Sequence, residues 1–336
     1  MKLYEFDLLI VGAGPVGLFS AFQAGMLNLN CAIIDSLNII GGQCTMLYPE
    51  KPIYDIPAYT RITGAELIEK LHNQIKPFRQ NIILNQRVES VEKQGELYLV
   101  KTFNSEFKVK AIIFATGGGN FTPNRPPLND IQKFENKSIF YSVTNTSIFQ
   151  NKNVMIAGGG DSAVDWAINL FEITNHIYVV HRRDKFRAME NSVKTLHELA
   201  SAGKITLLVP YQLFELHSNN EQLKFVSVQN LNGEIKNIEC DYLLPFFGIA
   251  SDNSAMLNWG LNLTNNNRYI EVNCSSMETN LKGIFAVGDI ASYPGKLKLI
   301  LTGFSEAALA VHTAFSIINP NQALHFEHST SKGIPF

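Results

Sequence analysis

A chain of 336 residues has room for two domains of ordinary size, and 46% of its residues are hydrophobic while 17% are charged. This composition is typical of globular proteins and excludes a largely disordered chain. The formal net charge of −2 gives no electrostatic reason to expect nucleic acid as a partner.

The N-terminal segment resembles neither a secretory signal nor a membrane span. Its first apolar run, residues 8–11, follows Glu5 and Asp7 and is interrupted at once by glycine. A secretory signal has a basic leader and a longer apolar core, and a membrane-spanning helix needs about 20 apolar residues. We therefore expect a cytoplasmic protein that has no membrane partner.

The hydrophobic pattern predicts one order of strands and helices that occurs twice along the chain. The first unit has a strand at 6–11, a helix at 18–27 and a strand at 31–35. Strand patterns follow at 82–91, 98–103 and 111–116. The second unit has a strand at 153–157, a helix at 162–174 and a strand at 177–181. A short strand at 283–287 and a long apolar helix at 302–318 come near the C-terminus.

Two such units predict an α/β fold with two Rossmann-like dinucleotide-binding domains. The late strand and helix most simply complete the first domain, so the second domain is expected to be inserted into it. We predict a discontinuous first domain of residues 1–116 and 247–336, and a second domain of residues 117–246.

The first glycine loop has the G-x-G-x-x-G spacing and lies directly between a strand and a helix. Gly12 permits the tight turn, Gly14 lets the backbone approach a pyrophosphate, and Gly17 lets the helix pack on the strand. The pyrophosphate then rests on the positive N-terminus of the helix. Asp35 ends the next strand, where a carboxylate accepts hydrogen bonds from an adenosine ribose. These features together predict a dinucleotide site.

The second glycine loop has the variant spacing G-x-G-x-x-A, with Gly158, Gly160 and Ala163 at the key positions. Asp35 lies 23 residues after Gly12, and His181 lies 23 residues after Gly158. Here the acid is replaced by a basic run with His181, Arg182, Arg183 and Arg187. Arginines bind a 2′-phosphate that an acid would repel, so the run predicts NADPH. The alternative interpretation is a solvated charge run after a strand.

One site suited to a neutral ribose and one suited to a 2′-phosphate indicate two different dinucleotides. A flavin that exchanges a hydride with a nicotinamide accounts for both, so we assign FAD to the first domain and NADPH to the second. Hydride transfer between two bound cofactors depends on alignment, so neither a catalytic acid or base nor a metal site is expected.

The four cysteines, Cys31, Cys44, Cys240 and Cys274, are far apart in the sequence and contain no C-x-x-C pair. This spacing excludes a sequence-local zinc site or redox dithiol and is typical of a reducing compartment. We expect all four to be buried as small apolar residues.

Further motifs resemble those of the thioredoxin-reductase-type ferredoxin–NADP reductases. They are the two glycine loops, GGQ at 41–43, LYPEK at 47–51, GGGDSAVDW at 158–166, HRRDKFRA at 181–188, GIFAVGDI at 283–290 and HSTS at 328–331. The resemblance covers essentially the whole chain. It implies a thioredoxin reductase-like fold, a homodimer, and ferredoxin, an acidic electron-transfer protein, as the partner of the flavin.

The resemblance also implies individual FAD contacts in addition to the glycine loop. They are Asp35, Gln43, Tyr48, Val88, Phe121, Asp289 and Thr330. Tyr48 and His328 are expected to stack on opposite faces of the flavin ring, and the tail that carries His328 is expected to come from the other subunit. The long helix after Asp289 is expected to aim its N-terminus at the pyrimidine end of the ring.

One departure separates this chain from thioredoxin reductases, which carry a C-x-x-C shortly before the second glycine loop. Residues 140–145 read FYSVTN instead. Electrons therefore cannot leave the flavin by disulfide exchange and must pass to an external acceptor. The sequence leaves open another acceptor, such as flavodoxin or a quinone, and also a flavoprotein that acts as a redox-responsive binding module.

Overall fold

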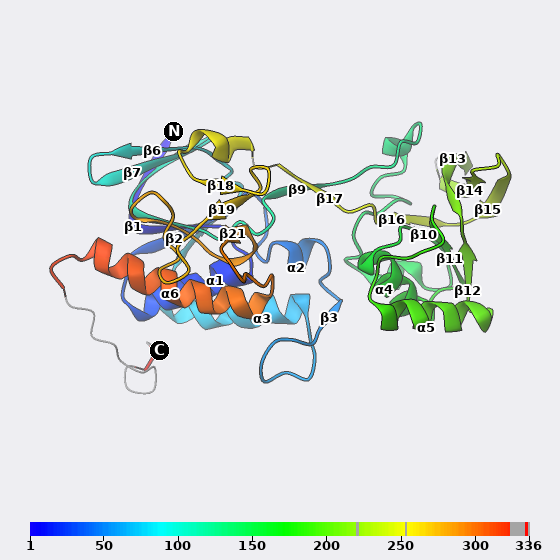
Figure 1. Ribbon diagram of the computed structural model, residues 1–336, viewed down its shortest axis with the longest axis horizontal. Helices are drawn as coiled ribbons and strands as arrows, with labels where there is room; N and C mark the ends of the chain where they lie inside the picture. The colour runs from blue at the N-terminus through cyan, green and yellow to red at the C-terminus, as the bar shows by residue number, and fades with distance from the viewer. Residues whose placement is uncertain (220–221, 253, 323–332, 335–336) are drawn as a thin grey trace. The chain divides into compact units, whose positions relative to one another are not determined.

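The computed structural model describes residues 1–219, 222–252, 254–322 and 333–334. The chain divides into two compact units, and each is described here by itself (Figure 1). The first unit consists of Met1–Phe121 and Ser251–Phe336, and the second consists of Thr122–Ala250. The chain passes between them in two segments that pair as strands β9 (Asn120–Pro123) and β17 (Ile249–Asp252).

The first unit is built on a mixed sheet in the order β5-β2-β1-β8-β7-β6, in which β20 also pairs with β8. Its strands are β1 (Lys2–Val11), β2 (Cys31–Ile34), β5 (Asn81–Ile83), β6 (Val88–Gln94), β7 (Leu97–Thr102), β8 (Ser105–Phe114) and β20 (Ile284–Ala286). β2, β1, β8 and β20 run parallel, so their carboxyl ends meet at one edge of the sheet. A ligand site is expected at such an edge in an open α/β sheet.

Three longer helices accompany this sheet. They are α1 (Pro15–Met26), α3 (Gly64–Ile75) and α6 (Ile300–Ile318) (Figure 1). α1 packs on β1 and β2, α6 packs on β8, and α3 packs on α1. α3 begins with a capping box, because the Thr63 side chain accepts from the Glu66 N–H and the Glu66 carboxylate accepts from the Thr63 N–H. α1 contacts both α3 and α6, so a segment near the C-terminus completes the first unit.

α6 is the one helix, among the residues that the structure describes, whose length and composition alone would allow it to cross a membrane. In the structure it packs against α1 and β8, and its side chains Ala307, Ala310 and Val311 are fully buried. It also buries a carboxylate, that of Glu306. These contacts are those of a core helix.

The prediction of a single strand at 82–91 is wrong, because this stretch forms two strands at opposite edges of the sheet. β5 pairs with β2, and β6 pairs with β7. Asn85, between them, has a left-handed φ of 58°. Asn85, Gln86 and Arg87 interrupt the apolar residues at this turn, so the sequence does mark the break, and the prediction of one strand passed over it.

Smaller elements cover the remaining parts of the first unit. They are α2 (Gln43–Met46), β3 (Pro52–Ile53), β4 (Ile62–Thr63), β18 (Leu263–Thr264), β19 (Tyr269–Glu271), β21 (Ala291–Ser292) and the 3-10 turns η1 (Lys76–Phe78), η4 (Ser254–Asn258) and η5 (Gly288–Ile290).

The second unit contains a parallel sheet in the order β12-β11-β10-β16 and an antiparallel sheet in the order β13-β14-β15. The strands are β10 (Asn153–Ala157), β11 (His176–Val180), β12 (Ile205–Leu208), β13 (Tyr211–Asn219), β14 (Gln222–Asn230), β15 (Ile235–Glu239) and β16 (Tyr242–Pro245). The helices are α4 (Asp161–Leu170) and α5 (Glu190–Ser201), with the 3-10 turns η2 (Ile131–Lys133) and η3 (Thr146–Phe149). Each unit therefore has its own set of parallel strands and its own core.

Candidate functional site

The first glycine loop joins β1 to α1, and two of its glycines are required by close backbone contacts. Gly12 has a φ of +113°, and a Cβ there would lie 2.4 Å from the carbonyl oxygen of Ala115. A Cβ on Gly17 would lie 1.8 Å from the carbonyl oxygen of Gly12. These glycines let the strand turn sharply and let α1 pack on it, as their spacing predicts.

The middle glycine, Gly14, has a different environment. A Cβ placed there would have no described atom within 4 Å. Gly14 is the N-cap of α1 and Pro15 follows it, while none of the described side chains caps this end of the helix. The backbone at Gly14 therefore borders open space, and no described side chain caps the N–H groups that follow Pro15, an arrangement that favours a phosphate group.

Asp35 directly follows β2 and is 8% exposed. One carboxylate oxygen accepts from the Ala13 N–H at 2.7 Å and the other from the Leu37 N–H at 2.9 Å. Burial raises the pKa of Asp35, while these backbone hydrogen bonds act in the opposite direction. Because a carboxylate accepts about four hydrogen bonds, capacity remains for the hydroxyls of a ribose.

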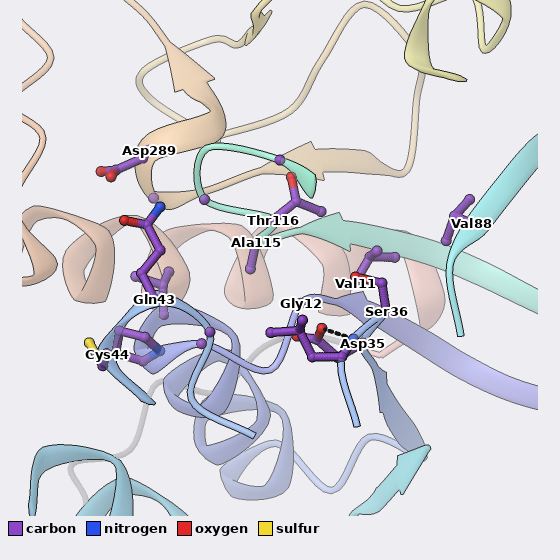
Figure 2. Close-up of a pocket in the computed structure, with 18 of the residues that line it drawn as sticks. Val11, Gly12, Asp35, Ser36, Gln43, Cys44, Val88, Ala115, Thr116 and Asp289 are labelled. Atoms are coloured by element: carbon purple, nitrogen blue, oxygen red, sulfur yellow. Dashed lines mark hydrogen bonds between the residues drawn. The ribbon is translucent and has the colours of Figure 1, made fainter. Parts of the chain in front are cut away.

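These residues lie in one cavity at the carboxyl edge of the first unit's sheet. Its walls include seven of the predicted FAD residues: Gly12, Gly14, Asp35, Gln43, Tyr48, Val88 and Asp289. Figure 2 shows Asp35, Ser36 and Val88 toward one end of the cavity, and Gln43, Cys44 and Asp289 toward the other. The cavity is therefore elongated, with a carboxylate at each end and the glycine loop along it.

A buried hydroxyl in the wall of this cavity lacks a partner. Thr116 follows β8, and its Oγ1 is buried without a hydrogen-bond partner among the described residues. Such an orphaned group costs about 1–3 kcal/mol unless a ligand or water satisfies it. Together with the open space at Gly14, it fits an elongated polar ligand such as an adenine dinucleotide.

A second helix begins at the same cavity. Leu299, the N-cap of α6, and Ile300, its first residue, both line the wall, and no described side chain caps this helix. Asp289 lies in η5 directly after β20 and faces the same space. The N-terminus of α6 therefore offers its free N–H groups to the end of the cavity that holds Asp289.

Tyr48 lines the cavity and is half-buried, and its hydroxyl accepts a weak hydrogen bond from the thiol of Cys44 at 3.7 Å. Burial raises the pKa of Cys44 to about 11, so this thiol is protonated and a poor nucleophile at neutral pH. Cys31 and Cys240 are also buried, but Cys274 is exposed. The expectation that all four cysteines are buried is therefore wrong for Cys274, which lies in the turn after β19.

The second glycine loop joins β10 to α4 and repeats this construction. Gly158 has a φ of +154°, and a Cβ there would lie 2.7 Å from the carbonyl oxygen of Phe246. Gly160 is the N-cap of α4, and a Cβ there would meet nothing within 4 Å in the part of the chain that the structure describes. Ala163 is fully buried against the loop. The free end of α4 therefore also suits a phosphate.

His181 lies beneath this loop rather than at its surface. It is 8% exposed, and a Cβ on Gly159 would lie 2.2 Å from its ring. Burial lowers the pKa of His181, and the charge of Arg187 acts in the same direction. The imidazole is therefore neutral at pH 7, and the charge of this region resides on the arginines.

The basic run is fixed to the glycine loop by the backbone. The Arg187 N–H donates to the Gly159 carbonyl at 2.7 Å, and the Met189 N–H donates to the Asp161 carboxylate at 2.9 Å. Arg182, Arg183 and Arg187 are exposed, and the last two line a shallow pocket. Their guanidinium groups are thus free to meet an anion from solvent while their backbone is held in place.

Three of the predicted site residues have side chains outside the described part of the chain. Phe121 lies in β9, and its side chain is outside the described part. Thr330 and His328 also lie outside the described residues. In the described ranges, 1–219, 222–252, 254–322 and 333–334, no group of three or more His, Cys, Asp and Glu side chains is placed to hold a metal ion.

The structure also adds cavity residues that sequence reasoning missed. They include Cys44, Gln86, Arg87, Thr116, Ala255, Met256, Trp259, Lys298, Leu299 and Ile300. Thr116 had a usable signal, since it ends a predicted strand just before three glycines. Trp259 had none, because it reaches the cavity from a turn by stacking on Phe114 at 5.2 Å between ring centroids.

Comparison with known proteins gives consistent results. Residues 6–313 match the family described as pyridine nucleotide-disulphide oxidoreductase. The chain is 52% identical over 331 residues to a protein of Rickettsia akari (strain Hartford) named ferredoxin–NADP reductase, with 98% of each chain covered. It is 53% identical over 327 residues to the protein of that name from Rickettsia felis, with 97% of each covered.

A solved structure supports the fold independently. The thioredoxin reductase of Lactococcus lactis matches 94% of this chain and 99% of its own, with a TM-score of 0.77 and 24% sequence identity. At this identity the likeness concerns the fold alone.

Proposed function

The chain belongs to the ferredoxin–NADP reductases of the pyridine nucleotide-disulphide oxidoreductase family, and we propose that FAD occupies the cavity of its first unit and NADPH the glycine loop of its second. The protein is a flavoenzyme that uses FAD and NADP(H) and moves electrons between NADPH and ferredoxin. FAD, when bound, supplies the redox chemistry by exchanging a hydride with NADPH and single electrons with ferredoxin.

The placement of FAD rests on one observation, that the cavity combines an uncapped helix N-terminus with carboxylates. The α1 N-terminus at Gly14 would hold the pyrophosphate, and Asp35 would accept hydrogen bonds from the adenosine ribose. Gln43, Tyr48, Thr116 and Asp289 would then surround the rest of the cofactor. Val88 would pack against the adenosine end, where its buried side chain lies.

The placement of NADPH rests on the exposed arginines beside the second glycine loop. Gly160 and the α4 N-terminus would hold the pyrophosphate, and Arg182, Arg183 and Arg187 would hold the 2′-phosphate. His181 would support the loop from beneath through its contact with Gly159. We propose the predicted ranges, 1–116 with 247–336 and 117–246, as the two cofactor domains.

The chain's own residues act by binding and orientation. Free N–H groups at the start of α6 would stabilise negative charge at the Asp289 end of the cavity. The protonated Cys44 thiol keeps the Tyr48 hydroxyl engaged from one side. The proposal requires no general acid or base, because alignment of the two cofactors is the main requirement of the reaction.

The experiment that tests the function uses purified protein with NADPH and cytochrome c, with and without ferredoxin. We expect strict dependence on ferredoxin, and release of FAD rather than FMN on denaturation. Turnover with flavodoxin or a quinone but not with ferredoxin would favour the alternative acceptor. Rapid binding of NADPH without turnover by any acceptor would favour a redox-responsive binding module.

Replacing all four cysteines with serine or alanine should leave substantial electron transfer from NADPH to a dye. The sequence has no C-x-x-C, and the raised pKa of Cys44 keeps its thiol protonated. Some loss of thermal stability is expected, because Cys31, Cys44 and Cys240 are buried. Efficient reduction of thioredoxin by the unmodified protein would contradict this prediction.

We further propose a cytoplasmic homodimer in which Tyr48 and His328 stack on opposite faces of the flavin. Tyr48 lines the cavity, which supports its part of the proposal. A chain truncated before Glu327 should show altered flavin fluorescence and altered NADPH kinetics, because one face of the ring loses its cover. The oligomeric state is measured by light scattering, and a truncated protein identical to the full chain in all these properties would refute the role of His328.

A further inference from the structure

Glu306 is a buried carboxylate that the arguments above do not use. It lies on α6 and is 3% exposed. One oxygen accepts from the backbone N–H of Gly288 at 2.7 Å. The other accepts from the Tyr293 hydroxyl at 2.5 Å and from the ammonium of Lys296. The side chain of Lys296 is itself only 7% exposed, so the two charges form a buried pair.

The three partners of Glu306 belong to the segment that forms the Asp289 end of the cavity. Gly288 and Asp289 line the wall, and so do Lys298, Leu299 and Ile300, which follow Lys296. A single carboxylate therefore holds the chain both just before Asp289 and just before the N-terminus of α6.

Close packing around Gly288 leaves the backbone of this turn little freedom to move. Gly288 has a φ of +74°, and its Cα lies 3.4 Å from where a Cβ of Gly303 would be. That Cβ would also lie 2.4 Å from a methyl group of Val16. The turn therefore packs closely against both α1 and α6. The hydrogen bond from the Gly288 N–H to Glu306 fixes the orientation of the turn between them.

Stability alone is a poor explanation for this arrangement. Moving a carboxylate and an ammonium out of water costs several kcal/mol per ion, and apolar residues of similar size often do as well. Each partner, however, becomes costly when the other is removed. A buried pair of this kind is better suited to fixing one geometry than to adding stability.

We propose that Glu306 is a positioning residue of the cofactor cavity, which fixes the Gly288–Asp289 turn and the 296–300 segment and thereby sets the affinity and the midpoint potential of the flavin. The inference rests on the proposed binding of FAD in this cavity. Glu306 itself does not line the cavity and acts through the segments that it holds.

The test compares Glu306→Gln, Lys296→Met and the double variant, with Glu278→Gln as the matched control. Glu278 also accepts from a glycine N–H, that of Gly283 at 2.8 Å, but at the opposite end of β20 from Gly288. Glutamine in place of Glu306 keeps the shape and leaves the Lys296 ammonium without its counter-charge. FAD affinity and the flavin midpoint potential are measured on each holoprotein by titration and spectroscopy.

Glu306→Gln is expected to weaken FAD binding by about tenfold or more, as for loss of a charge-assisted hydrogen bond. The midpoint potential is expected to rise by about 30 mV, which corresponds to a tenfold stronger preference for the electron-rich reduced flavin in this two-electron couple. The double variant should return the potential close to the starting value, because it removes both charges. Glu278→Gln should change the FAD affinity by no more than about twofold and leave the midpoint potential unchanged, even where it lowers the melting temperature.

The outcomes separate the inference from the function on which it rests. Unmodified protein that binds no FAD would overturn the proposed function. Unmodified protein that binds FAD, together with a Glu306→Gln variant that matches Glu278→Gln in affinity and potential, would overturn the positioning role alone. A Glu306→Gln variant that merely melts earlier, with an unchanged potential in its FAD-loaded fraction, would likewise reduce Glu306 to a structural residue.

Discussion

Replacing both Arg182 and Arg183 with alanine is expected to erode the preference for NADPH over NADH by about 100-fold or more, since each charge-assisted phosphate contact contributes about 1.5–3 kcal/mol. The loss should appear mainly in KM for NADPH, because these contacts are made equally in the ground state and the transition state. The adjacent His181 cannot substitute for them, since burial lowers its pKa and keeps it neutral.

NADH provides the control for this experiment, because it carries no 2′-phosphate. The kinetics with NADH should change little in the double variant, and the backbone bond from Arg187 to Gly159 should keep the loop in place. Lys204→Ala removes an exposed positive charge elsewhere in the second unit and should leave both coenzymes unaffected. An unchanged NADPH/NADH ratio in the double variant would show that the two arginines are a solvated charge run.

Substituting the middle glycine of each loop should separate the two cofactor sites. Gly14→Ala is expected to weaken FAD binding by about 100-fold or more, because the methyl group occupies the space where the pyrophosphate would approach two N–H groups, each bond being worth about 1.5–3 kcal/mol. The FAD-free protein should melt at an unchanged temperature, since the new Cβ meets no described atom within 4 Å and φ at Gly14 is −72°.

Gly160→Ala is the matched variant in the second loop, where a Cβ also has open space. It should bind FAD normally and show a raised KM for both NADPH and NADH, because the pyrophosphate is common to the two. Binding constants for FAD and steady-state kinetics for both coenzymes check the pair. A Gly14→Ala protein that purifies with full FAD content would place the cofactor elsewhere.

Several features followed from short stretches of sequence because their causes are local. The close contacts at Gly12 and Gly17 are fixed by the tight passage from strand to helix, so their spacing predicts the turn. Strand β10 occupies Asn153–Ala157, the range that the apolar pattern predicts. The position of the arginines after the second β–α–β unit could likewise be predicted, because it depends only on where β11 ends.

Other features depended on contacts between residues far apart in the chain. The split of 82–91 into β5 and β6 is decided by which neighbour each strand pairs with, and an apolar pattern carries no information on that choice. The ring of His181 enters the space under Gly159 because that glycine has no side chain. Its residue type and position predict an NADPH contact, and the structure adds that its buried ring supports the loop at Gly159.

The sequence by itself determined that the chain has two Rossmann-like units, each with a glycine loop between a strand and a helix, and that a C-x-x-C is lacking, since each of these depends on residues close together in the chain. Only the tertiary structure decided that Trp259 joins the cavity wall and that Glu306 holds the turn before Asp289. A buried polar contact needs two groups brought together by the packing of whole helices and sheets. Glu306 and Gly288 are 18 residues apart, on a helix and a turn, and only the fold places the carboxylate 2.7 Å from that N–H.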